Sequence, residues 1–196
     1  MTTDTKQKLH TYLREAREAV LRKAEGLGEY DLRRPLTRTG TSILGLIKHL
    51  SLVEAWYFGA CFDRPLEPHL TGWDEGAEEE NDMWATAQES STDLIATYRA
   101  AIAHADATIE ALDADAVGHV PWWKTGEVTL HSMLVHVLSE TARHAGHGDI
   151  LREGLDARAG MSKGNTNQGD HDDDWWATHR ARIEAAAREA AGLPEQ

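Results

Sequence analysis

Apolar residues recur at three- and four-residue steps along several long segments of the chain, which is the spacing of amphipathic helices. The first such segment covers residues 5–25, and charged residues occupy the positions between its apolar ones. Its apolar positions are Leu9, Leu13, Ala16, Val20 and Ala24. Gly26 and Gly28 follow directly, so the pattern predicts a helix that ends there.

A second helix is predicted after residues 29–40, which contain Pro35 and show no helical periodicity. Thr41 or Ser42 can cap its N-terminus, and a strongly apolar run then continues to about Cys61. Residues 62–77 are rich in proline and glycine, so we expect a connection long enough to reach the other end of a helical bundle. The second and third helices would then run parallel.

The third helix is expected over about residues 78–112, either continuous or broken near its start. Its predicted apolar side consists of Trp84, Leu94, Tyr98, Ile102 and Ile109. After a turn-rich stretch, Thr129 can cap a fourth helix that continues to Glu153 and stops at Gly154. Residues 156–173 favour a loop, and residues 174–191 a fifth, peripheral helix. No strand-like alternation of useful length occurs, so the pattern predicts one all-α domain over residues 1–196.

Composition places the chain among globular proteins, because 41% of its residues are hydrophobic and 27% are charged. No stretch approaches the roughly 18 apolar residues that span a bilayer, and the N-terminus lacks a signal-peptide core. The single Cys61 suits a reducing compartment, so we expect a cytoplasmic protein in which this thiol is packed among apolar residues. A net charge of -13 argues against nucleic acid as a partner.

The fourth predicted helix carries the most informative residues, because four of the 11 histidines fall between His131 and His147. At 100° per residue, His136, Glu140 and His144 lie on one face, and His147 lies close to it. Glu140 and His144 are one turn apart, a spacing at which two side chains can reach one metal ion. The same spacing also suits a simple salt bridge on a helix face.

A metal site needs a third ligand from another helix, and His49 is the best candidate because it lies in the apolar run SILGLIKHLSLVEAW. An isolated histidine on an apolar face is also often a hydrogen-bonded core residue. Spacing alone therefore leaves metal binding, a salt bridge and core packing open for these three residues.

Three segments resemble one family. The stretches TGTSILGLIKHLSLVEAWYFG, PWWKTGEVTLHSMLVHVL and ETARHAGHGDILREGLD are similar to the DinB-like superfamily, in particular to a bacterial branch related to mycothiol-dependent enzymes. The resemblance covers about residues 8–190 and implies a four-helix bundle with up-down-down-up order. It also implies a metal held by one ligand on the second helix and an i, i+4 pair on the fourth.

These ligand positions correspond to His49, Glu140 and His144 of this sequence. The commonest version of the family has three histidines, whereas the mycothiol-dependent maleylpyruvate isomerase branch has the His, Glu, His pattern found here. His147 stands where many relatives have glutamine, and we expect it to support the ligands or the pocket wall. Glu140 and His147 are the residues expected to take part in catalysis.

Three ligands leave a coordination position open, which is typical of catalytic metal sites. Zn²⁺ is the first expectation, with Ni²⁺, Fe²⁺ or Mn²⁺ as alternatives. The resemblance implies a low-molecular-weight thiol, with mycothiol favoured, that is transferred to a small electrophile. A metal-dependent hydrolase and a non-catalytic metal-binding stress protein are the alternative functions, and a homodimer is a plausible assembly.

Three tryptophans are candidates for the wall of this pocket. Trp122 and Trp123 precede the fourth helix directly, and Trp56 lies seven residues after His49. Each could bind the thiol cofactor at the metal end of the bundle, and plain core packing is the alternative for each.

Overall fold

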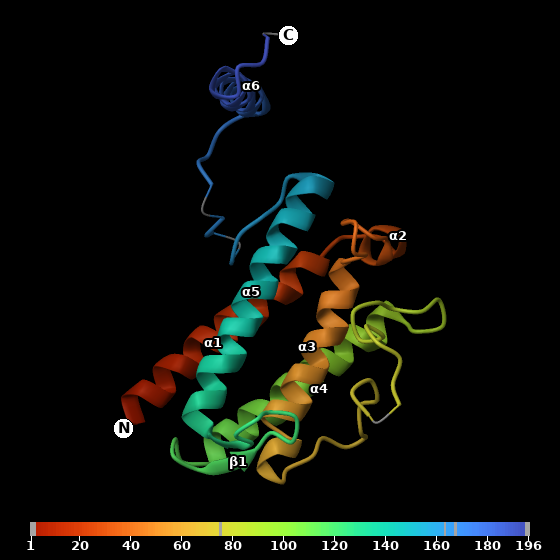
Figure 1. Cartoon of the computed structure of the whole chain (residues 1–196), viewed down its shortest axis with the longest axis vertical. Coiled ribbons are helices and arrows are strands. Elements are labelled where there is room, and N and C mark those ends of the chain that lie inside the picture. The colour runs from red at the N-terminus through yellow and green to blue at the C-terminus, as the bar shows by residue number, and fades with distance from the viewer. Residues whose placement is uncertain (1–2, 75, 163, 167, 195–196) are drawn as a thin grey trace. The chain divides into compact units, whose positions relative to one another are not determined.

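The chain is mainly helical, as the sequence predicts. The computed structural model describes residues 3–74, 76–162, 164–166 and 168–194. In chain order its helices are α1 Thr3–Ala24, α2 Glu29–Arg33, α3 Ile43–Tyr57, the 3₁₀ helix η1 Ala60–Phe62, α4 Ser91–Ala111, α5 Leu130–Asp156 and α6 Asp173–Ala190 (Figure 1). None of the helices in these ranges is long and apolar enough to cross a membrane.

Capping residues set the starts of the two helices that matter most for the site. Ser42 caps α3, where its hydroxyl accepts a hydrogen bond from the Gly45 amide at 3.1 Å. Thr129 caps α5 and forms a reciprocal capping box with Ser132. Both N-termini lie where the sequence predicts them, because a side-chain oxygen there satisfies an amide that the helix leaves unpaired.

The predicted third helix begins too early. Helix α4 starts at Ser91 behind the N-cap Ser90, and residues 78–90 form turns and irregular backbone. The irregular backbone is held by side chains from other elements, since Lys48 donates to the Trp84 carbonyl and Arg33 donates to the Thr86 carbonyl. Trp84 is therefore exposed instead of lying on the apolar side of a helix.

Two smaller predictions are also wrong. A short antiparallel pair, β1 Val117–His119 and β2 Glu127–Thr129, lies in the turn-rich stretch where no strand was expected. Helix α5 passes through Gly154 and ends at Asp156, followed by Ala157 in a left-handed conformation. The extra turn is held by Arg152, which binds the Asp156 carboxylate and the Lys23 carbonyl.

The core lies between the four long helices of the first part of the chain. Helix α1 packs along α5 and helix α3 packs along α4, while α3 also contacts α5 and α1 (Figure 1). The largest buried side chains include Leu13, Ile43, Leu44, Ile47, Leu50, Phe58, Tyr98, Ile109, Leu130 and Met133. Cys61 is packed as expected, and burial raises the pKa of its thiol to about 11, so the thiol is not a ready nucleophile.

Two compact units make up the chain, Met1–Thr166 and Asn167–Gln196. Helix α6 belongs to the second unit and starts at Asp173, behind the N-cap Asp172, whose side chain accepts a hydrogen bond from the Trp175 amide at 2.8 Å. The fifth predicted helix is thus confirmed to within one residue at each end. The single domain over residues 1–196 stays a prediction.

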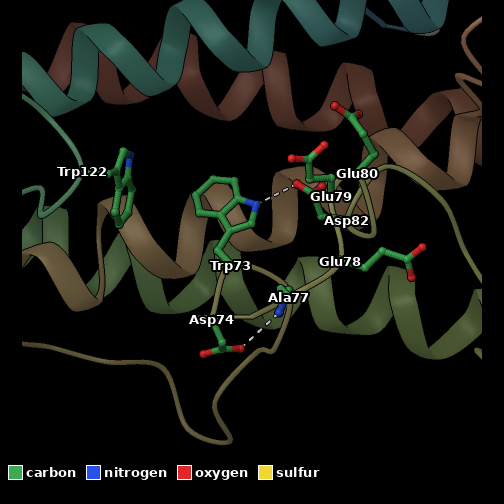
Figure 2. A pocket seen from close by; sticks show the side chains of 9 residues that line it. Trp73, Asp74, Ala77, Glu78, Glu79, Glu80, Asp82 and Trp122 are labelled. Carbon is green, nitrogen blue, oxygen red and sulfur yellow. Dashed lines mark hydrogen bonds between the residues drawn. The ribbon is translucent and has the colours of Figure 1, made fainter.

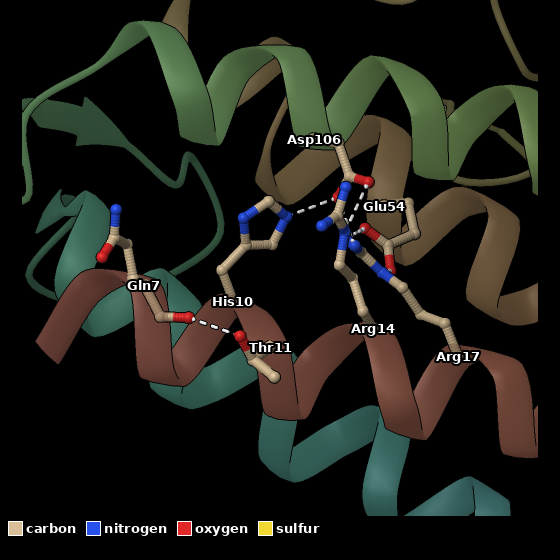
Figure 3. A network of polar contacts seen from close by, with 7 residues as sticks. All are labelled: Gln7, His10, Thr11, Arg14, Arg17, Glu54 and Asp106. Carbon is tan, nitrogen blue, oxygen red and sulfur yellow. Dashed lines mark hydrogen bonds and ion pairs between the residues drawn. The ribbon is translucent and has the colours of Figure 1, made fainter. Parts of the chain in front are cut away.

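A buried ion network connects α1, α3 and α4 (Figure 3). Arg17 of α1 binds both carboxylate oxygens of Glu54 at 2.7 and 2.6 Å, and it also reaches Asp106 at 2.6 Å. His10 contacts the same Asp106 oxygen at 2.7 Å. Arg17 and Glu54 are almost wholly buried, so this pairing fixes the position of three helices relative to one another.

The network predicts a specific acid sensitivity. Burial opposes the ionisation of Asp106, but the hydrogen bond from His10 and the charge of Arg17 outweigh it and lower its pKa to about 2. Because this pKa lies below the unfolded value, the stabilisation is complete above about pH 5 and is lost progressively as the pH falls through about 2. We expect Asp106→Asn to lower the free energy of unfolding by about 2 kcal/mol at pH 7 and by much less near pH 2.5.

Urea denaturation of both proteins at pH 7, 4 and 2.5 measures this difference. The control is Asp115→Asn, which alters an exposed aspartate of the turn after α4. A difference between wild type and Asp106→Asn that stays constant over this pH range would contradict the assignment.

Candidate metal centre

Helices α3 and α5 bring three metal-ligating side chains to one place. His49 comes from α3, while Glu140 and His144 come from α5, where they are separated by one helical turn. One donor atom from each side chain lies within 4.8 Å of the other two. The structure therefore juxtaposes the three residues that the sequence singled out.

Glu140 lies between the two imidazoles. Its Oε1 is 3.0 Å from His144 Nε2 and 3.6 Å from His49 Nε2. The two rings lie edge to face with their centroids 5.0 Å apart. His144 is buried, and His49 and Glu140 are partly buried, so the three groups face one another at the edge of the core.

His49 Nε2 is the least satisfied atom of this group. It is buried and has no hydrogen-bond partner among the described residues. The other ring nitrogen, Nδ1, donates to Asp82 Oδ2 at 2.7 Å, so in a neutral ring Nε2 is an acceptor that faces the Glu140 carboxylate. Two acceptors facing each other are unfavourable, and a buried unpaired acceptor costs about 1–3 kcal/mol. A cation between them would satisfy both, so these residues fit a divalent metal.

Sequence reasoning missed Asp82 and Trp73, which hold His49 in place. Asp82 Oδ2 accepts hydrogen bonds from His49 Nδ1 and from Trp73 Nε1, each at 2.7 Å. A carboxylate behind a histidine ligand fixes its tautomer and ring orientation. Asp82 gave no signal because the sequence placed it within the predicted third helix, whereas it lies in the connection between η1 and α4.

Gly45 explains how this connection reaches helix α3. A Cβ atom at residue 45 would lie 1.9 Å from the carbonyl oxygen of Met83, so only glycine permits the approach. Gly45 is one turn before His49 on α3, and Met83 follows Asp82 directly. The absence of one side chain thus lets Asp82 reach the ring of His49.

The electrostatics of the group favour a negative carboxylate at Glu140 beside a neutral imidazole at His144. Burial opposes ionisation of Glu140, but the neighbouring His144 and His49 outweigh it and lower its pKa. Burial and the proximity of His49 lower the pKa of His144. Asp82 is likewise held ionised, because the hydrogen bonds from His49 and Trp73 lower its pKa despite burial. Neutral imidazole and ionised carboxylate are the states that bind metals.

Two further histidines of α5 lie outside the three-donor group. His136 sits edge to face with Tyr57 and with Trp123, each at a centroid distance of 4.9 Å. Burial lowers its pKa, so it is a packed neutral ring. His147 is exposed, and its Nδ1 lies 3.4 Å from His144 Nδ1. It is thus a neighbour of one candidate ligand and not a member of the three-donor group.

The predicted tryptophans form part of a continuous aromatic cluster. Trp122 contacts Trp56 at 5.7 Å and Trp73 at 5.9 Å between ring centroids, and Trp73 contacts His49 at 5.8 Å. Tyr57 lies behind them against Trp73, Trp122 and Trp123. Trp122 is therefore connected to the candidate ligand His49 through the ring of Trp73. Trp123, by contrast, is partly buried and packs against the hydrophobic core.

A cavity of about 470 Å³ opens beside this cluster. Trp122 contributes to its lining, and the other lining residues, among them Trp73 and Asp82, belong to the connection before α4 (Figure 2). Its volume is suited to a small organic molecule. Since Trp73 and Asp82 also contact His49, the cavity shares a wall with the candidate metal centre.

Comparison with known protein families gives a match over most of the chain. The family described as mycothiol-S-transferase matches residues 8–157, which run from within α1 to the end of α5 and include all three candidate ligands. A search of curated proteins finds no match. Because the family match covers most of the chain, the chain belongs to the mycothiol S-transferase family, a DinB-like family.

Proposed function

We propose that this protein is a metal-dependent thiol S-transferase that joins mycothiol to a small electrophile. The observation that carries the proposal is the orphaned Nε2 of His49, which faces Glu140 and His144 within a chain of the mycothiol S-transferase family. A helical protein has little reason to bury an unpaired imidazole nitrogen against a carboxylate unless a cation joins them. The family supports a thiol as the co-substrate.

His49, Glu140 and His144 would hold the ion, with Zn²⁺ as the first expectation and Ni²⁺, Fe²⁺ or Mn²⁺ as alternatives. When bound, such an ion supplies the Lewis acidity that lowers the pKa of a thiol and so provides the reactive thiolate near neutral pH. The donor set has one carboxylate and two neutral rings, so it leaves positive charge for an anionic sulfur.

The surrounding residues have distinct tasks in this proposal. Asp82 fixes His49 so that its Nε2 faces the site, and Trp73 holds Asp82 in turn. The rings of Trp122 and Trp56 exclude water from one side, which strengthens electrostatic interactions. His147, which is exposed beside His144, would pass the proton released by the thiol to solvent.

The remaining sequence-based expectations belong to the same proposal. The long connection between η1 and α4, together with the pairing of α1 with α5 and of α3 with α4, supports the up-down-down-up order of a four-helix bundle. A cytoplasmic location, where mycothiol would be reduced, and assembly as a homodimer complete the proposal.

Metal content gives the first test of the centre. Protein purified without chelator should contain about one divalent ion per chain, and His49→Ala, Glu140→Ala and His144→Ala should each lose it. The control is His136→Phe, which keeps a packed ring outside the donor group and should keep the metal. Elemental analysis measures this, and a metal-free wild type that cannot be reloaded would end the proposal.

Thermal unfolding gives a second measure. Chelator should lower the melting temperature of the wild type by on the order of 5–10 °C, because bound metal stabilises only the folded state. It should have little effect on His144→Ala, which lacks a ligand. Equal chelator sensitivity in the two proteins would separate the metal from these residues.

The close approach at Gly45 predicts an effect at a distance from the ligands. Gly45→Ala should displace Met83 and with it Asp82, so metal affinity should fall about 10- to 100-fold, as when a carboxylate behind a histidine ligand is lost. Asp82→Asn should give a similar loss. Gly154→Ala is the matched control, because its Cβ meets nothing within 4 Å, and it should keep affinity and gain up to about 1 kcal/mol of stability. Competition with a metal indicator measures the affinities.

The reaction itself is tested with a bimane electrophile. Wild type loaded with metal should accelerate conjugation of mycothiol to monobromobimane, and both Glu140→Gln and removal of metal should abolish most of the acceleration. Mycothiol should be used better than glutathione. Hydrolysis of an ester or amide without thiol would favour the hydrolase, and metal binding without either activity would favour a non-catalytic metal-binding protein.

A further inference from the structure

The cavity beside the candidate metal centre has walls of two kinds. On one side are the indole rings of Trp73 and Trp122, whose centroids are 5.9 Å apart with their planes nearly perpendicular. On the other side is the acidic segment before α4. In Figure 2 the ring of Trp73 lies between Trp122 and the carboxylate of Asp82, to which its Nε1 donates.

The indole pair makes the cavity suitable for a flat ring. Trp73 is held by its hydrogen bond to Asp82, and Trp122 is held against Trp56 and Tyr57. Two fixed aromatic rings at an angle offer one face and one edge to a ligand ring. Indole faces also attract organic cations.

Charge gives the cavity its selectivity. Five of its described lining residues are acidic, namely Asp74, Glu78, Glu79, Glu80 and Asp82, and none of the described ones is lysine, arginine or histidine. Asp74 is paired with His69, and Asp82 with His49, whereas Glu78, Glu79 and Glu80 have no ion-pair partner among the described residues. Carboxylates only accept hydrogen bonds, so the lining repels anions and favours a positively charged ligand.

The cavity also lies where a second substrate is needed. Asp82 and Trp73 belong both to its wall and to the hydrogen-bonded chain that positions His49. We propose that this cavity receives the electrophile and that it selects flat aromatic electrophiles that carry a positive charge. The inference rests on the proposed function for the identity of the bound molecule as electrophile.

In the reaction of such a substrate, the thiolate sulfur forms a bond to the electrophilic carbon. The bond from that carbon to a halide breaks, and the halide leaves with the electron pair. The thiol proton passes to solvent. No oxidant or reductant is required, so the cavity has only to bind and orient the ring.

Equilibrium binding tests the cavity without any reaction. Phenyltrimethylammonium, benzyl alcohol and benzenesulfonate have one aromatic ring each and differ in charge. Calorimetric titration of the protein should show the cation binding at least about tenfold more tightly than the alcohol, with no binding of the sulfonate. Trp122→Leu should weaken the binding of both the cation and the alcohol. Equal affinities for cation and anion would overturn the inference.

A charge variant then assigns the preference to this cavity. The triple variant Glu78→Gln, Glu79→Gln, Glu80→Gln should lower affinity for the cation about tenfold and leave affinity for the alcohol unchanged. The matched control is the triple variant Glu25→Gln, Glu110→Gln, Glu153→Gln, which removes three exposed charges elsewhere. Equal losses in the two triple variants would mean that overall charge, and not the cavity, attracts the cation.

Kinetics with two bimanes distinguish this inference from the proposed function. Monobromobimane is neutral and monobromotrimethylammoniobimane is cationic, and both react with thiols by loss of bromide. After subtraction of the uncatalysed rates, kcat/KM should favour the cation in wild type, and the cavity triple variant should reduce that preference about tenfold. Metal-dependent conjugation of both bimanes without preference would overturn the inference about the cavity but would still support the proposed transferase function.

The remaining outcomes are also decisive. If neither bimane is conjugated, the proposed transferase function is contradicted, and so is the proposed role of the cavity as an electrophile site. A raised KM for mycothiol in the cavity triple variant, with an unchanged bimane preference, would mean that the cavity receives the thiol substrate instead, which also overturns the inference.

Discussion

The approach of the Met83 carbonyl to Gly45 is the contact on which the arrangement of the site depends. A Cβ at residue 45 would overlap the carbonyl oxygen at 1.9 Å, so the irregular segment before α4 can lie on helix α3 only because that position has no side chain. The contact brings Asp82 to Nδ1 of His49, and Asp82 in turn holds Trp73. One backbone contact therefore determines both the orientation of a candidate ligand and one wall of the cavity.

Helix α3 connects this site to the rigid part of the molecule. Its Glu54 is fully buried and accepts hydrogen bonds from Nε and Nη2 of Arg17. The third nitrogen of this arginine, Nη1, donates to Asp106 of α4. His49 lies five residues earlier on the same helix. Because the ion network restrains sliding and rotation of α3, the distance between His49 and the α5 pair is set by the core and not by a mobile loop.

The sequence predicts the helices well where local chemistry decides them. Ser42 and Thr129 carry capping oxygens, and the periodic apolar residues of α1, α3 and α5 need a core. The sequence does not predict the backbone of segments whose conformation depends on contacts with distant residues. Residues 78–90 have a helical pattern, but their structure is irregular because carbonyls of this segment accept hydrogen bonds from Lys48 and Arg33. No local pattern reveals those partners.

In the candidate site, too, some residues can be predicted from local sequence patterns and others only from tertiary contacts. The i, i+4 spacing of Glu140 and His144 and the apolar setting of His49 suffice to select three residues that the structure brings within 4.8 Å of one another. Asp82, Trp73 and Tyr57 could not be selected, because their roles depend on a connection whose course is fixed by tertiary contact. Buried charge networks such as Arg17 with Glu54 are equally invisible in the sequence, since each member looks like a surface residue of an amphipathic helix.

The difference between a His, Glu, His set and three histidines has a chemical consequence for the proposed reaction. Two neutral imidazoles and one carboxylate around a divalent ion leave one net positive charge, which a single thiolate would neutralise. Three neutral histidines would leave two, and would hold a thiolate more firmly and make it a weaker nucleophile. In the proposed reaction, Glu140 would thus favour a thiolate that is formed at neutral pH yet remains reactive. The acidic cavity next to it would then favour a positively charged electrophile over an anionic one.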